Sequence, residues 1–136
     1  MSYFIGVDYG SKRTGLAVGT KAGRFVLPLT TIQTQGAAEA DARIVLELCL
    51  DYEVEAFVVG LPLNMDGSEG PQAKLTRVFG DALARAAGKP VHYWDERLSS
   101  FAAEDALHEK ELTRKRRRDQ VNRVAAQIIL EGFLSR

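Results

Sequence analysis

The stretch Phe4-Ile-Gly-Val-Asp8-Tyr-Gly10-Ser-Lys-Arg-Thr-Gly15 combines an apolar run, a carboxylate and a glycine-rich turn. Its apolar residues predict a buried strand over 3–7, and the residues after the turn predict a second strand over 14–18. Asp8 therefore comes at the end of a buried strand, where its charge is costly to desolvate unless a cation meets it. A divalent metal ion is the simplest such cation, although Asp8 and Gly10 alone would also fit a strand-to-turn boundary.

Further along the chain, the apolar pattern changes from consecutive strands to helices that alternate with strands. A third strand around Phe25 to Ile32 completes an antiparallel meander. Periodicity and glycine or proline breakers then predict a helix over 37–50, a strand over 56–60, a loop over 64–71, a helix over 74–87, a strand over 91–94, a helix from 99 or 100 to about 110, and a helix over 119–134. This order implies an α/β fold with a five-stranded mixed sheet, antiparallel in strands one to three and then parallel, with helices on both faces. Ribonuclease H-like folds have this order.

The bulk composition fits one ordinary globular domain over residues 1–136. The chain is 46% hydrophobic and 26% charged, and its length suits a single core. No apolar run approaches the ~18 residues of a membrane span, and no basic and then apolar signal segment begins the chain, so we expect a cytoplasmic protein without a membrane partner. The lone Cys49 excludes a disulfide and a cysteine-based zinc site, and the scattered His92 and His108 argue against a histidine-based metal site.

The charges are unevenly distributed, although the net charge is zero. Residues 1–111 carry 11 Lys or Arg against 16 Asp or Glu, whereas residues 112–136 carry 7 against 2. The basic excess is centred on Arg114, Lys115, Arg116, Arg117 and Arg118. Such a run is most often a solvated loop, but here candidate acidic metal ligands are predicted nearby, which favours binding of a phosphate backbone.

Three motifs occur in an order that resembles the YqgF/RuvX family. They are Asp8-Tyr-Gly10 with Thr14-Gly15, then Val59-Gly60-Leu-Pro62-Leu-Asn64-Met-Asp-Gly67, then Asp95-Glu96-Arg97-Leu-Ser99. The resemblance implies a ribonuclease H-like fold with a metal-dependent nuclease site. Members are described either as processing the 5′ end of precursor 16S ribosomal RNA or as Holliday junction resolvases.

The resemblance also implies the acidic residues of the site. Asp8 and Glu96 match two of the family's acids. The third family aspartate falls on Asn122, counting back from the Ala-Ala-Gln-Ile-Ile-Leu run over 125–130, and the nearest carboxylate is Asp119, one helical turn away. We therefore assign Asp8, Glu96 and Asp119 as catalytic metal ligands, with Asn122 as a neutral ligand. Oxygen ligands suit Mg²⁺ or Mn²⁺, and a pair of ions ~3.5–4 Å apart is expected.

Several polar residues are assigned to the substrate on the same grounds. Lys12, Arg13 and Arg97 would contact phosphates near the cleavage point, Asn64 would lie close to the site, and the basic run over 114–118 would hold the backbone further away. Simpler interpretations remain. Lys12 and Arg13 also fit a solvated turn, Asn64 fits a turn residue, and Glu96 alone fits an ion pair with Arg97 or another cation.

These features together predict a metal-dependent endonuclease that acts on nucleic acid. The preferred function is 5′-end processing of pre-16S rRNA in ribosome biogenesis. The alternative is Holliday junction resolution, which requires a homodimer because symmetric cutting needs two sites related by a dyad. A second alternative is a non-catalytic RNA-binding assembly factor, suggested by Asn122 and the basic run. The first turn also resembles the phosphate loop of actin-like ATPases and sugar kinases, but these enzymes close two domains around ATP, and the P-loop ending is absent.

Overall fold

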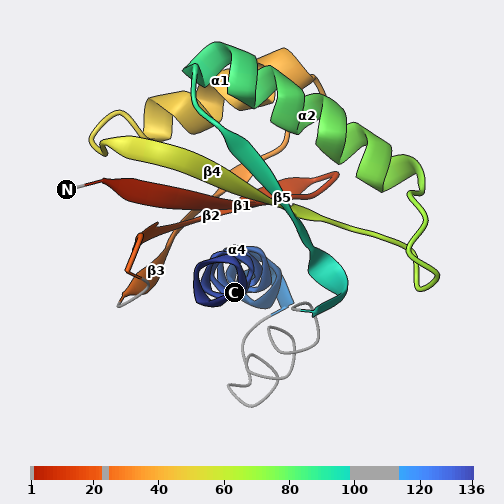
Figure 1. Ribbon diagram of the computed structural model, residues 1–136. Coiled ribbons are helices and arrows are strands. Elements are labelled where there is room, and N and C mark those ends of the chain that lie inside the picture. The colour runs from red at the N-terminus through yellow and green to blue at the C-terminus, as the bar shows by residue number, and fades with distance from the viewer. Residues whose placement is uncertain (1, 23–24, 99–113) are drawn as a thin grey trace.

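A five-stranded sheet with the strand order β3-β2-β1-β4-β5 is the centre of the structure (Figure 1). The computed structural model describes residues 2–22, 25–98 and 114–136, with side chains for 2–22, 25–97 and 122–136. Helices α1 and α2 cover one face of the sheet, and α4 crosses the other. The elements are β1 (Tyr3–Tyr9), β2 (Arg13–Thr20), β3 (Val26–Gln33), α1 (Ala38–Leu48), β4 (Val54–Leu61), α2 (Pro71–Ala87), β5 (Val91–Asp95), the 3-10 helix η1 (Glu96–Leu98) and α4 (Arg114–Ser135).

The pairing of the strands confirms the predicted mixed sheet. β1 pairs antiparallel with β2, and β2 pairs antiparallel with β3, whereas β1 pairs parallel with β4 and β4 with β5. Parallel pairing aligns the carboxyl ends of β1, β4 and β5 at one edge of the sheet. The residues that follow these three strands therefore meet at that edge.

Two helices begin three or more residues earlier than the sequence predicts. α2 begins at Pro71 and not at residue 74, because a proline lacks the N–H that the first helical turn leaves unpaired anyway. α4 begins at Arg114 and not at residue 119, so the basic run over 114–118 is helical and its interpretation as a loop is wrong. The helix predicted from 99 or 100 to about 110 lies outside the described residues.

The face of the sheet toward α1 and α2 is closed by a dense apolar core. Alternate residues of the two central strands, such as Val7 and Phe57, are fully buried there against Phe79 and Leu83 of α2. The period-two alternation of strands places their neighbours on the opposite face. Burial of this core supplies most of the stabilisation of the layer, since each large apolar side chain contributes roughly 1.5–3 kcal/mol.

The opposite face packs closely against α4. Its apolar residues, among them Phe4 and Val58, contact Ile129 and Leu130 of the helix. At Gly15 the approach is closest, because a Cβ there would collide with the backbone carbonyl of Asn122. Glycine at this position allows the helix backbone to rest directly on β2. None of the helices among residues 2–22, 25–98 and 114–136 has the length and apolar character needed to cross a membrane.

Candidate active site

Asp8 lies at the carboxyl end of β1, on the face of the sheet that carries α4. The alternation of β1 settles this orientation, because Phe4 packs against α4 while Val7 and Tyr9 belong to the opposite core. Asp8 is half-buried, and its strand partner is Gly15 of β2. The carboxylate therefore lies where α4 touches the sheet.

Glu96 begins η1 directly after β5 and reaches the same place. The register pairs Leu61 of β4 with Asp95, so Glu96 lies one residue beyond the last paired position. Its Cγ is 3.3 Å from the point where a Cβ on Gly60 would lie, which places it over the end of β4. The side chains of Asp8 and Glu96 are hydrogen-bonded to each other. The structure thus brings together the two acids assigned from the sequence.

The electrostatics of this pair are unfavourable without a cation. Burial raises the pKa of Asp8 well above its ordinary value of 3.8, and the charge of Glu96 and the hydrogen bond with its carboxyl raise it further. Loss of the proton from a carboxyl group in this environment is unfavourable unless positive charge compensates it. Two contacting carboxyl groups therefore form an oxygen-rich site that a hard divalent cation would fit.

The third assigned acid, Asp119, lies on α4, but its side chain is outside the described part of the structure. Asn122, one turn further along the helix, has its backbone carbonyl against Gly15, the strand partner of Asp8. This segment of α4 therefore passes beside the acidic pair. Among the described residues, no three His, Cys, Asp or Glu side chains are grouped so that they could hold a metal ion, so the complete ligand set stays a prediction.

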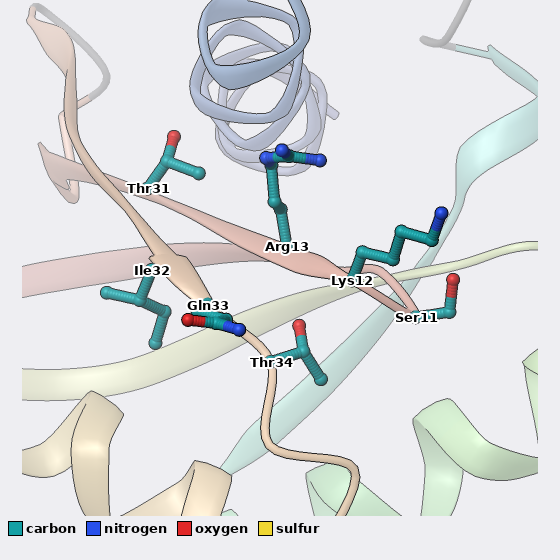
Figure 2. A pocket seen from close by; sticks show the side chains of 7 residues that line it. All are labelled: Ser11, Lys12, Arg13, Thr31, Ile32, Gln33 and Thr34. Carbon is teal, nitrogen blue, oxygen red and sulfur yellow. The ribbon is translucent and has the colours of Figure 1, made fainter. Parts of the chain in front are cut away.

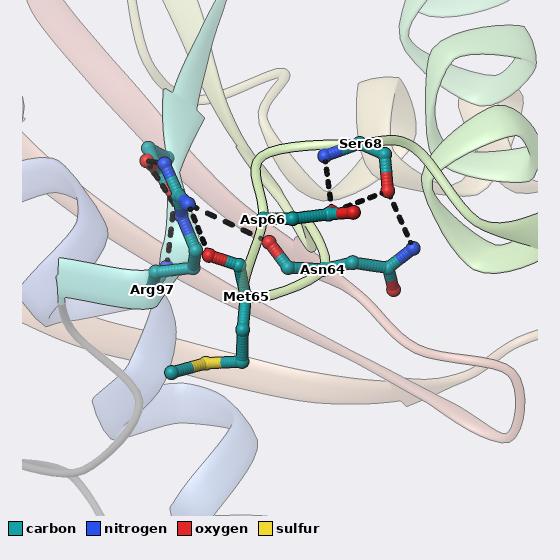
Figure 3. A network of polar contacts seen from close by, with 6 residues as sticks. Asn64, Met65, Asp66, Ser68 and Arg97 are labelled. Atoms are coloured by element: carbon teal, nitrogen blue, oxygen red, sulfur yellow. Dashed lines mark hydrogen bonds and ion pairs between the residues drawn. The ribbon is translucent and has the colours of Figure 1, made fainter.

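Arg97 is held at the protein surface by a clamp of hydrogen bonds to Asp95 and to the loop over 64–68 (Figure 3). Its Nη2 donates to Asp95 Oδ2 at 2.7 Å, and its Nε lies 3.0 Å from each oxygen of that carboxylate. Its Nη1 donates to the Met65 carbonyl at 3.1 Å and lies 3.5 Å from that of Asn64. The ion pair of Arg97 is thus with Asp95, and the contact lowers the pKa of that carboxyl. These bonds give Arg97 a positioning role, and its predicted contact with phosphate remains untested.

The loop that Arg97 contacts, residues 64–68, is stabilised by its own hydrogen bonds. The Asn64 amide nitrogen Nδ2 donates to Ser68 Oγ at 3.0 Å, and the Ser68 N–H donates to Asp66 Oδ1 at 2.9 Å. Gly67 has a φ of 87°, which favours glycine and closes the turn. Asn64 therefore has a structural role in the loop, as the turn interpretation predicts, and its assignment to the substrate stays a prediction.

The remaining assigned residues lie near the same edge of the sheet. Lys12, in the β1–β2 turn, and Arg13, the first residue of β2, line a pocket of about 550 Å³. The basic run over 114–118 forms the first turns of α4, and its side chains lie outside the described set. Lys12 and Arg13 thus lie just beyond the carboxyl end of β1, and residues 114–118 precede Asn122 on α4.

Asp41 is an important residue that the sequence interpretation missed. It lies on α1 with 1% of its surface exposed. The Tyr9 hydroxyl donates to its Oδ2 at 2.6 Å, and the Gln35 N–H donates to its Oδ1 at 2.7 Å. Burial and the bond to Asp41 raise the pKa of Tyr9. The available signal in the sequence was a carboxylate next to Ala42 and Val45 on the apolar face of the predicted helix. Such a carboxylate is buried and needs a hydrogen-bond donor.

Comparisons with known proteins agree with the family resemblance of the sequence. A family model described as "RuvX: Holliday junction resolvase" matches residues 2–136. A protein of Anaeromyxobacter dehalogenans (strain 2CP-C) named "Putative pre-16S rRNA nuclease" is 48% identical over 132 residues, which is 97% of this chain and 96% of that protein. A protein of the same name from Ruegeria sp. (strain TM1040) is 42% identical over 136 residues, covering 100% of this chain and 86% of its own.

Solved structures confirm the ribonuclease H-like fold. RuvC of T. thermophilus, solved in complex with a Holliday junction substrate, superposes with a TM-score of 0.60 at 20% identity, covering 98% of this chain and 94% of RuvC. A ROK hexokinase from Thermus thermophilus has a TM-score of 0.50 at 21% identity, covering 75% of this chain but only 38% of the kinase. The similarity to the kinase covers only a part of that enzyme, in line with the shared strand-turn-strand start. At about 20% identity, the similarities to RuvC and to the kinase describe the fold alone.

Proposed function

Because the chain belongs to the RuvX family, we propose that it is a divalent-metal-dependent endonuclease that processes the 5′ end of pre-16S rRNA. The observation that carries the proposal is the contact between the Asp8 and Glu96 carboxyl groups at the carboxyl edge of the sheet. Two acids in contact and partly desolvated lower the stability of the metal-free protein, and they are tolerated at sites that bind cations. Action on ribosomal RNA would place the protein in the cytoplasm.

The proposed ligands of the metal are Asp8, Glu96 and Asp119, with Asn122 as a neutral oxygen donor. Carboxylate and amide oxygens are the donors that Mg²⁺ and Mn²⁺ prefer. A pair of bound ions would align the attacking water with the phosphodiester and stabilise the leaving oxygen. The chain supplies the fixed frame for this chemistry, because Asp8 is anchored in the central strand and Glu96 is held between the two ends of the Asp95–Arg97 clamp.

Holliday junction resolution is the second candidate, favoured by the description of the family model. The two substrates differ in symmetry. A resolvase must present two active sites to a four-way junction, so this function requires a homodimer. Processing of a single RNA strand requires one site.

The decisive experiment compares the two substrates in one assay. Purified protein with Mg²⁺ or Mn²⁺ would be incubated with a labelled pre-16S rRNA 5′ leader and, in parallel, with a labelled four-way DNA junction. The Asp8→Asn variant controls for contaminating nuclease. Cleavage of the leader that disappears in the variant supports the proposal, whereas cleavage of the junction alone, by a dimer, supports the second candidate. Binding without metal-dependent cleavage would refute both and favour a non-catalytic assembly factor.

A further set of variants addresses the third ligand on α4. Asp119→Asn should raise the Mn²⁺ concentration needed for half-maximal cleavage, and Asn122→Asp should lower it by adding a charge to the site. Asp51→Asn, at an exposed carboxylate after α1, is the matched control and should change nothing. An Asp119→Asn variant with an unchanged Mn²⁺ requirement would remove Asp119 from the ligand set.

A further inference from the structure

A polar pocket lies beside the β1–β2 turn and the end of the edge strand β3 (Figure 2). Its volume of about 550 Å³ is within the range of ~300–1,000 Å³ usual for ligand sites. Unlike most such sites it is lined mainly by polar and cationic side chains, which indicates a polar or anionic ligand. The polar lining residues are Ser11, Lys12, Arg13, Thr31, Gln33 and Thr34.

Hydrogen bonds between the turn and the end of β3 fix the shape of this pocket. The Thr34 N–H donates to the Lys12 carbonyl at 2.9 Å, and the Thr34 hydroxyl donates to the Gly10 carbonyl at 2.8 Å. The Gly10 N–H closes the turn by donating to the Arg13 carbonyl at 2.9 Å. The pocket is therefore preorganised, which reduces the ordering cost of binding.

The side chains in the pocket divide into two chemical kinds. Lys12 and Arg13 carry positive charge, whereas Ser11 and Gln33 carry neutral hydrogen-bonding groups. The side chains of Ser11, Lys12 and Gln33 form no hydrogen bond or ion pair with any other residue in the described part of the chain. These groups are available to a ligand that offers both a phosphate and a neutral hydroxyl.

The register of the sheet connects the pocket with the acidic pair. Asp8 pairs with Gly15, and Gly15 pairs with Thr31, so these residues form one row across β1, β2 and β3. Adjacent strands lie about 4.8 Å apart, which puts the backbones of Asp8 and Thr31 roughly 10 Å from each other. Arg13 and Thr31 both point to the side of the sheet that carries α4 (Figure 2). One nucleic-acid strand can therefore contact the pocket and the acids together.

We propose that this pocket binds one ribonucleotide of the substrate strand, next to the cleavage point, and selects RNA over DNA. Lys12 and Arg13 hold its phosphate, while Gln33 and Ser11 contact its ribose. The 2′-hydroxyl both donates and accepts hydrogen bonds, as do the Gln33 carboxamide and the Ser11 hydroxyl, whereas a cation holds phosphates of RNA and DNA alike. The inference rests on the proposed function, since that function supplies the nucleic acid.

The test measures binding separately from cleavage. In an Asp8→Asn background with Mg²⁺, a short fluorescein-labelled RNA strand and the DNA strand of the same sequence are titrated by fluorescence anisotropy. RNA should bind several-fold more tightly than DNA. Adding Gln33→Ala and Ser11→Ala should bring the two affinities together by weakening RNA binding. Lys12→Ala should weaken both by the same factor and reduce the salt slope by about one.

Lys89→Ala is the matched control, because Lys89 is an exposed lysine beyond the end of α2 and should leave both affinities unchanged. Circular dichroism confirms that each variant is folded. The proposal would be overturned if the Asp8→Asn protein bound RNA and DNA with equal affinity. It would also be overturned if Gln33→Ala and Ser11→Ala left the preference for RNA over DNA unchanged. Cleavage by protein with Asp8 intact is scored separately. An RNA preference that depends on Gln33 without cleavage supports the pocket and refutes the nuclease, whereas cleavage with an unaffected preference refutes the pocket alone.

Discussion

Two acids lie on opposite sides of the end of β1, the buried Asp41 and the half-buried Asp8, and their surroundings differ in one decisive respect. Asp41, on the α1 side, receives hydrogen bonds from the Tyr9 hydroxyl and the Gln35 N–H. Asp8, on the α4 side, meets the carboxyl group of Glu96. A carboxylate that is matched by donors stabilises the fold, while one matched by a second acid costs stability until a cation binds. Tyr9 thus serves the structure on one face of β1, while its neighbour Asp8 on the other face is the proposed metal ligand.

The largest effect should come from removing the charge of Asp8. Asp8→Asn should lower metal-dependent cleavage by at least about 100-fold, since the loss of a metal ligand removes roughly 3 kcal/mol of transition-state stabilisation. The same variant should unfold at the same temperature as the parent or higher, because the repulsion between the two acids is gone. Cleavage rates and thermal melts measure the two effects. A variant that cleaves normally would show that Asp8 has no part in the chemistry.

The second effect concerns the free energy of unfolding and the hydrogen bond between Tyr9 and Asp41 on the α1 side of the sheet. Tyr9→Phe should lower the free energy of unfolding by about 1–3 kcal/mol, because the buried Asp41 carboxylate loses one of its two donors. Cleavage per folded molecule should stay within about twofold of the parent. Urea denaturation measures the loss of stability. Tyr52→Phe is the control, since the Tyr52 ring packs against Tyr3 while its hydroxyl makes no hydrogen bond within the described residues. Equal losses in both variants would contradict the special role of the Tyr9 hydroxyl.

The third effect is a dependence of stability on pH that follows from the raised pKa of Asp8. Above the ordinary pKa of 3.8, the unfolded chain releases a proton that the folded, metal-free protein still binds at Asp8. The contribution of this group to stability therefore declines as the pH rises toward the folded pKa. Thermal melts of the parent and of Asp8→Asn between about pH 4 and 8 isolate this contribution by difference.

Saturating Mn²⁺ should abolish that decline, because the cation takes the place of the proton. Removal of the metal with EDTA should restore it. A difference between the parent and Asp8→Asn that is the same at every pH would mean that Asp8 titrates as an ordinary carboxyl group, and the contrast with Asp41 would lose its basis.

The smallest effect should come from the clamp beside Glu96. Arg97→Lys keeps the positive charge but loses the two-pronged contact with Asp95 and the bonds to the loop carbonyls. Because both side chains are about one-third exposed, solvent screens the pair and the loss of stability should stay below about 1 kcal/mol. The turnover number should fall roughly 3- to 10-fold at an unchanged KM, since Glu96 is less well positioned. A rise in KM alone would favour the predicted contact with phosphate.

The acids at the carboxyl edge could be located from the sequence, because Asp8 lies at the end of one apolar strand, Glu96 directly follows another, and parallel pairing brings such ends together. The role of Arg97 could not, since the direction of its guanidinium depends on a loop more than 30 residues earlier in the chain. Asp41 was missed for a related reason. Helical periodicity identifies the inward face of α1, but the donor that makes a buried carboxylate tolerable comes from β1. Contacts between distant segments, and not local propensity, decide these cases.

Because Gly15 has no side chain, direct contact between the two backbones fixes the distance between α4 and β2. The backbone of Asn122 rests on Gly15, the strand partner of Asp8. This contact sets where the α4 backbone at 119–122 lies relative to Asp8. A methyl group at Gly15 would push the helix away from β2 and move Asp119 relative to Asp8 and Glu96, its partners in the proposed ligand set. A change at a residue without charge or hydrogen-bonding side chain could in this way silence the site as completely as the loss of a ligand.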